Sequence, residues 1–150
     1  MTIDELLQTP YWIVDILPGQ VPQGSPGQYF AVERYYPEDS RIAEIKQKHI
    51  NVVLKLNCYM DVSLVCIDED YRQEDEEDSS QQGGIINPPP KEIADAMRRQ
   101  YLYVMTGDAM ILSEPDDTHL TVFNPDEELL ELVRNIAGGE GLFVWQPKEI

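Results

Sequence analysis

The fold is decided by residues 102–112, which read Leu102-Tyr103-Val104-Met105-Thr106-Gly107-Asp108-Ala109-Met110-Ile111-Leu112. Two apolar runs flank a Thr-Gly-Asp turn, so we expect strands over 102–105 and 109–112. A further strand is expected over 118–123, after the acidic turn 114–117. Short connections favour antiparallel pairing, because a parallel crossover needs about a dozen residues or more. The centre of the chain therefore predicts an antiparallel sheet.

A helix is predicted directly after these strands. Asn124 is a residue type that favours the N-cap, Pro125 fits the first helical position, and the next three residues are acidic, as the helix dipole prefers. The apolar residues of its buried side are Leu129, Leu130, Leu132, Val133 and Ile136. We expect Gly138-Gly139 to end the helix, and residues 142–145 to form a closing strand.

The N-terminal part of the chain predicts a second set of hairpins and helices. Thr2 and Glu5 have the spacing of a capping box, so a short helix is expected to open the chain and to stop before Pro10. The expected strands are an inner strand over 11–17, a second over 28–36, and an antiparallel hairpin of 50–56 with 60–66. The expected helices lie over 38–48 and from 91 to 101.

These elements together predict the fold class. We expect an α+β fold in which hairpins build an antiparallel sheet of six to eight strands, with three to four helices mainly on one face. A chain of 150 residues has the size of one domain, so residues 1–150 are expected to form a single α+β domain. Residues 68–84 combine acids with Ser, Gln and Gly, and are expected to form a mobile acidic loop.

The charge of the chain excludes several classes of partner. Asp and Glu number 28 against 11 Lys and Arg, a formal net charge of −17. Nucleic-acid phosphates and anionic membranes would repel such a chain, so we expect neither as a partner. The first twenty residues lack the basic start of a signal peptide, and no apolar run approaches the length of a membrane span. We therefore expect a soluble, cytoplasmic protein.

The acidic run is the first candidate site. Its carboxylates are Asp68, Glu69, Asp70, Glu74, Asp75, Glu76, Glu77 and Asp78. An EF-hand loop that began at Asp68 would need Gly at its sixth position and Glu at its twelfth, where the chain has Gln73 and Ser79. An EF-hand loop is thus excluded. The run is expected to be a solvated, self-repelling loop, a docking strip for a basic partner or, as a third alternative, a metal site of clustered carboxylates.

Aromatic residues near the N-terminus are the second candidate. The rings that we expect to contribute to partner binding are Tyr11, Trp12, Tyr29, Tyr35 and Tyr36. Strand alternation would turn about half of them into the core and half outward. Exposed aromatic rings beside acids resemble the anchors of protein interfaces. Asp15 and Glu33 are expected on the same two strands.

Histidines, aspartates and cysteines supply the remaining candidates. Asp117 and His119 are two positions apart, next to Asp116, and would share one face of a strand, as a base or a metal site requires. His49 is expected to meet a helix dipole. Cys58 and Cys66 are expected to be buried thiols rather than a disulfide. No nucleophile elbow, Walker loop or dinucleotide fingerprint is present.

The leading functional hypothesis is a non-catalytic acidic module, such as an inhibitor, adaptor or antitoxin-like protein, that binds a basic protein partner without a cofactor. The first alternative is a small metal-dependent hydrolase that uses Asp116, Asp117, His119 and an acid such as Glu114 or Asp108. The second alternative is a homo-oligomeric structural protein that is joined through a sheet edge or the aromatic face. Each remains open at the level of the sequence.

Overall fold

The computed structural model describes residues 1–19, 26–36, 38, 41–67 and 86–147. Over these residues the chain forms five helices and one antiparallel sheet of 6 strands, the α+β class that the sequence predicts. The elements are α1 (Ile3–Leu6), β1 (Tyr11–Asp15), α2 (Tyr29–Tyr35), α3 (Arg41–Tyr59), β2 (Ser63–Ile67), α5 (Pro90–Arg99), β3 (Tyr101–Thr106), β4 (Ala109–Ser113), β5 (His119–Phe123), α6 (Glu127–Gly139) and β6 (Phe143–Trp145).

The strands lie in the order β2-β3-β4-β5-β1-β6, and every neighbouring pair is antiparallel. The central hairpin is the one that the sequence predicts: Thr106 pairs with Ala109 across a turn in which Gly107 has a φ of 57°, a value that glycine adopts readily. The first strand in the sequence becomes an inner strand, since β1 pairs with both β5 and β6. The prediction of an inner strand near residue 11 is confirmed.

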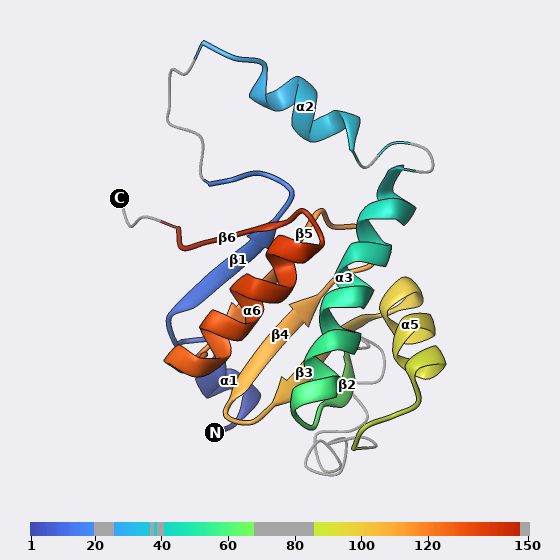
Figure 1. Ribbon diagram of the computed structural model, residues 1–150, viewed down its shortest axis with the longest axis vertical. Helices are drawn as coiled ribbons and strands as arrows, with labels where there is room; N and C mark the ends of the chain where they lie inside the picture. The colour runs from blue at the N-terminus through green and yellow to red at the C-terminus, as the bar shows by residue number, and fades with distance from the viewer. Residues whose placement is uncertain (20–25, 37, 39–40, 68–85, 148–150) are drawn as a thin grey trace.

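Three helices cover one face of the sheet. Figure 1 shows α6, α3 and α5 side by side in front of the strands. Their buried side chains pack on alternate strand residues such as Val14, Val104, Ile111 and Val122 to form the main core. Alternation puts the intervening strand residues on the opposite face. The helices therefore lie mainly on one face, as expected.

The opposite face is covered in part by α1. Leu6 packs there on Met110 and Phe123 to form a second, smaller core. The predicted cap of this helix is present, because the backbone N–H of Glu5 donates to Thr2 Oγ1 at 3.1 Å. The other end of this face, where β5, β1 and β6 meet, carries the candidate site.

The predicted hairpin of 50–56 with 60–66 is wrong in its first half, because residues 41–59 form the single helix α3. The apolar positions of residues 50–56 fit both the two-residue period of a strand and the period of a helix. Val53 is 0% exposed although a strand would turn it away from Val52 and Leu54, and Ile45, His49 and Val53 recur every four residues toward the core. Contact with α5 and α6 favours the helical alternative. The second half is present as β2, which pairs with β3 instead.

The predicted strand over 28–36 is also wrong, because residues 29–35 form the helix α2. Both edges of β1 are occupied by β5 and β6, so the segment that follows β1 in the chain finds no free edge there. The segment instead closes local hydrogen bonds, such as Val32 N–H to Gln28 O at 3.0 Å.

Two smaller predictions need correction. The N-cap of α6 is Asp126 rather than Asn124: its Oδ1 accepts the Leu129 N–H at 2.8 Å, while Asn124 adopts a φ of 60° at the end of β5. Both cysteines are exposed rather than buried. Cys58 lies two residues beyond buried Leu56, where the helix has turned outward, and Cys66 lies on the edge strand β2.

Two further expectations concern the acidic loop and membrane-spanning segments. The acidic loop expected at 68–84 lies outside the described residues. Among the helices that the structure describes, none combines the length and the apolar character that crossing a membrane requires.

Candidate functional site

The site begins with a buried carboxylate at the end of β1. Asp15 is the cross-strand partner of His119 on one side and of Phe143 on the other. Only 8% of Asp15 is exposed, and its Oδ1 accepts the backbone N–H of Ile16 at 2.7 Å. Burial raises the pKa of Asp15, and this effect exceeds the opposing influence of Ile16 and of the nearby His119. Asp15 is therefore a strongly desolvated acid.

His119 is held by an acid from the preceding turn. Its Nδ1 lies 2.9 Å from Oδ1 of Asp117, and the hydrogen bond to Asp117 raises the pKa of His119 in spite of partial burial. Burial of Asp117 opposes its ionisation, but the hydrogen bond and charge of His119 outweigh burial and lower the pKa of Asp117. The same carboxyl accepts the Thr118 N–H at 2.8 Å. The pair fixes the imidazole at the start of β5.

Asp15 and His119 share a pocket of about 530 Å³ on the face opposite the three long helices. Strands β1, β5 and β6 form its floor, and Glu33 of α2 contributes to its wall. The lining residues are Tyr11, Ile13, Asp15, Ile16, Leu17, Glu33, Thr118, His119, Thr121, Phe123, Trp145 and Pro147. This volume lies in the range of small-ligand sites, about 300–1,000 Å³.

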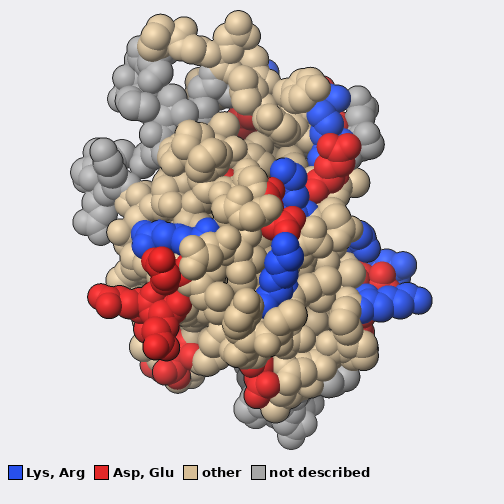
Figure 2. Space-filling view, viewed as in Figure 1, with Lys and Arg blue, Asp and Glu red and all other residues tan. Residues whose placement is uncertain are grey.

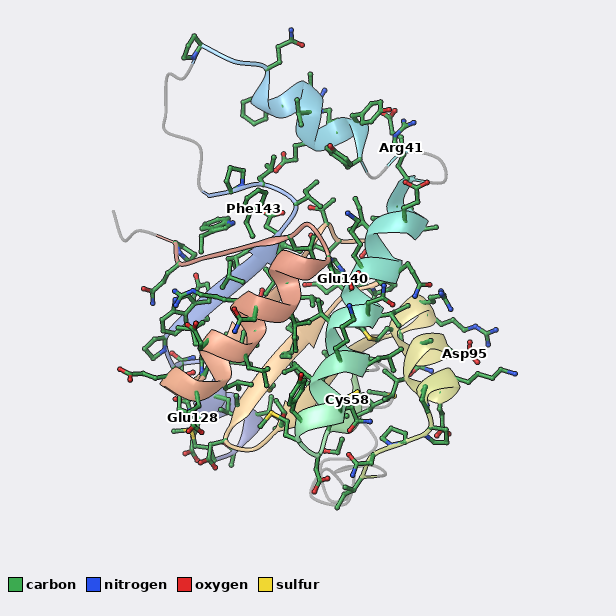
Figure 3. The ribbon with its side chains drawn as sticks, in the orientation of Figure 1. Arg41, Cys58, Asp95, Glu128, Glu140 and Phe143 are labelled. Carbon is green, nitrogen blue, oxygen red and sulfur yellow. The ribbon has the colours of Figure 1, made fainter. Side chains whose placement is uncertain are left out.

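An indole group faces the carboxylate in this pocket. Trp145 Nε1 is buried and makes no hydrogen bond of ordinary geometry with the described residues. The indole nevertheless lies close enough to Asp15 to favour the ionised form of the carboxyl group. Tyr11 is 40% exposed at the rim, with its ring 5.6 Å from that of Phe123. Figure 3 shows Phe143 on β6, on the side of the segment that leads from β1 toward α2. The pocket combines aromatic walls with an acid.

A buried lysine lies behind the turn that carries Asp117. Lys46 of α3 is 3% exposed; its Nζ donates to the carbonyl of Glu114 at 2.6 Å and lies 3.2 Å from Nδ1 of His49. Burial lowers the pKa of Lys46 to about 8, although the acids of residues 114–117 oppose this effect. Burial and the charge of Lys46 lower the pKa of His49 to about 3. His49 is thus neutral and accepts from the ammonium, which corrects the expectation that it meets a helix dipole.

The residues of the predicted metal site do not converge. Asp117 pairs with His119, whereas Asp116 accepts from the hydroxyl of Tyr101 at 3.2 Å. Asp108 follows β3, next to Asn124, and so lies at the opposite end of β5 from His119. Within the part of the chain that the structure describes, no three His, Cys, Asp or Glu side chains are placed to hold a metal ion.

The predicted aromatic set is divided between three places. Tyr11 lines the pocket, and Trp12 lies on the helix-bearing face opposite Val122. Tyr35 and Tyr36 belong to the end of α2, where Arg41 lies 3.8 Å from the centre of the Tyr35 ring and donates to the Tyr35 carbonyl (Figure 3). The side chain of Tyr29 and residues 68–78 lie outside what the structure describes.

Sequence reasoning missed Lys46 and Trp145. Lys46 directly follows Ile45 and precedes His49 by three residues, on the side of α3 that is buried. That spacing was the available signal. Trp145 was recognised only as part of a closing strand, because its place beside Asp15 depends on the pairing of β6 with β1.

Comparison with protein-family models, curated proteins and solved structures returned no match. Functional inference for this chain therefore rests on its own residues.

Proposed function

We propose that this chain is a non-catalytic binding protein whose partner is a basic protein segment. The pocket lined by Asp15 carries the proposal, because its lining combines a buried carboxylate with aromatic side chains. Exposed aromatic rings surrounded by polar residues are typical anchors of protein interfaces. Because these acidic groups are negatively charged, the partner must carry positive charge.

Charge outside the pocket supports the same sign of partner. Eight of the 28 acids of the chain fall between Asp68 and Asp78, and their field attracts cations whatever their conformation. The helix-bearing face is more mixed: in Figure 2 acidic atoms gather over the first turn of α6 and basic atoms over α5. We therefore assign the partner to the opposite face, and regard residues 68–78 as an aid to association.

The proposal is tested with immobilised peptides that match in length and aromatic content but carry either Lys and Arg or neutral residues. Binding of the basic peptides alone, with an association rate that falls as salt rises, supports the proposal. A variant with residues 68–78 neutralised should associate more slowly with little change in dissociation, because long-range charge acts mainly on encounter. Equal binding of neutral peptides, or no binding of basic peptides at low salt, would exclude this function.

A second candidate function is general base catalysis, which is favoured by one contact. The 2.9 Å pairing of Asp117 with His119 orients an imidazole that lines the pocket and raises the pKa of His119, as a base held by a carboxylate requires. A hydrolase screen with native protein and the His119→Ala variant tests it. Any turnover that disappears in the variant would favour catalysis over binding alone.

A further inference from the structure

We propose that the pocket between β1, β5 and β6 receives an arginine side chain of the partner, whose guanidinium pairs with Asp15 beside the indole of Trp145. This inference rests on the proposed function and specifies its anchor residue. Two features of the site favour arginine: the carboxylate that would accept its hydrogen bonds, and the side chains around that carboxylate. The same features disfavour anions and lysine.

The acceptor is Asp15. A buried ionised carboxylate is costly unless a cation pairs with it. Its Oδ1 accepts from Ile16 at 2.7 Å, and the Leu17 N–H and the Trp145 indole also lie close enough to favour its ionised form. A carboxylate offers about four lone-pair sites, so capacity for one further donor remains. His119 is close enough to favour the ionised form of Asp15, but its Nδ1 is directed at Asp117. Among the described lining residues no Lys or Arg supplies the missing charge.

The walls favour a planar cation. Trp145 lines the pocket close to the acid, whereas Tyr11 and Phe123, which pack on one another with ring centres 5.6 Å apart, line it four residues away along β1. Cations are attracted to the faces of aromatic rings, and a guanidinium also stacks on them. The methylene stem of an arginine would pack on Ile13, which lines the same pocket.

Two other ligand classes fit less well. An anion would meet the carboxylate of Asp15, which lines the same space. A lysine ammonium is more strongly hydrated than a guanidinium and loses more on entering a desolvated site. Arginine also presents donors in a fixed plane that suits a carboxylate. The chemistry of the pocket therefore selects arginine among basic side chains.

The test uses three capped tripeptides, Gly-Arg-Gly, Gly-Lys-Gly and Gly-citrulline-Gly, titrated into the native protein by NMR. Citrulline keeps the shape of arginine and lacks its charge, so this comparison requires no variant to fold. The indole N–H of Trp145, assigned with the Trp145→Phe variant, is the reporter. The arginine peptide should shift this signal most, the lysine peptide less, and the citrulline peptide should bind about tenfold more weakly or not at all.

Asp15→Asn tests the acceptor, because asparagine keeps the shape and still accepts from Ile16. Its arginine affinity should fall about tenfold or more, whereas Glu128→Gln, which removes an exposed charge on α6, should retain native affinity. Thermal unfolding confirms that both variants are folded. Equal responses to arginine and citrulline would overturn the assignment. If basic peptides bind while Asp15→Asn changes nothing, the anchor alone is wrong; if no basic peptide binds, the proposed function is wrong as well.

Discussion

Asp15 and His119 are direct partners in the β1–β5 ladder, and both side chains line the same pocket. Their surroundings differ: burial dominates for Asp15, whereas a hydrogen bond from the neighbouring turn dominates for His119. One strand pair thus presents a buried acid beside a histidine whose Nδ1 is already held by Asp117. This asymmetry makes Asp15, rather than Asp117, the group available to a positive ligand.

The pairing of His119 with Asp117 predicts a pH-dependent contribution to stability. The pKa of His119 is raised in the folded state, so the folded protein binds this proton more tightly than the unfolded chain. The contribution is fully present below the ordinary histidine pKa of 6.5 and is lost as pH rises through the raised value. Asp117→Asn should lower the pKa of His119, as measured by NMR titration of its ring.

Urea unfolding across this pH range checks the same prediction thermodynamically. The native protein should lose more stability than Asp117→Asn as pH rises from below 6.5 through the folded-state pKa of His119. Glu128→Gln serves as a control for the loss of one carboxylate and should follow the native curve. Identical curves for native protein and Asp117→Asn would contradict the assigned pairing.

Lys46 predicts the opposite trend at alkaline pH. Burial lowers its pKa to about 8 from the ordinary value of 10.5, so between these values the unfolded chain binds more protons than the folded protein. The free energy of unfolding should therefore gain a rising component across this interval. Lys46→Met should lose that component, whereas Lys55→Met, at a side chain 53% exposed, should keep it. If the free energy of unfolding of the native protein and of Lys46→Met had the same pH dependence, Lys46 would be exposed to solvent rather than buried.

The path of residues 50–56 is tested by a substitution that nearly preserves volume. Val53 is fully buried in α3, but a strand would turn it outward, away from Val52 and Leu54. Val53→Thr should reduce the free energy of unfolding by about 1–3 kcal/mol, because the helix buries the new hydroxyl. Cys58→Ser, at an exposed position of the same helix, should change it by less than about 0.5 kcal/mol. An equally small effect of Val53→Thr would indicate that Val53 is exposed, as the predicted strand requires.

The sequence predicted those elements in which one period was unambiguous. The β3–β4 hairpin, β5 and the apolar side of α6 were recognised because their patterns fit only one structure. Residues 50–56 fit both a strand and a helix, and packing against α5 and α6 favours the helix. Residues 28–36 were predicted as a strand but form the helix α2, and the strand β1 that precedes them has no free edge.

The candidate site was predictable only in parts. Asp117 and His119 were recognised as a pair because they are close in the chain, and the structure brings them together. Asp15 meets His119 and Trp145 only because β1, from the N-terminus, inserts between β5 and β6. Strand order across such separations is a tertiary property that local periodicity does not encode. The burial of Lys46 likewise depends on the turn at Glu114, far from it in sequence.

The pKa of Asp15, measured by NMR of its side-chain carboxyl with and without the arginine tripeptide, tests the central claim most directly. Without peptide the value should lie above that of an ordinary aspartate, since burial raises it. A guanidinium bound beside the carboxylate must lower this pKa, because proton and cation compete for the same charge and their coupling is reciprocal. The account predicts a clear fall at saturation with the arginine peptide and none with the citrulline peptide. A pKa of Asp15 that saturating arginine peptide leaves unchanged would contradict it.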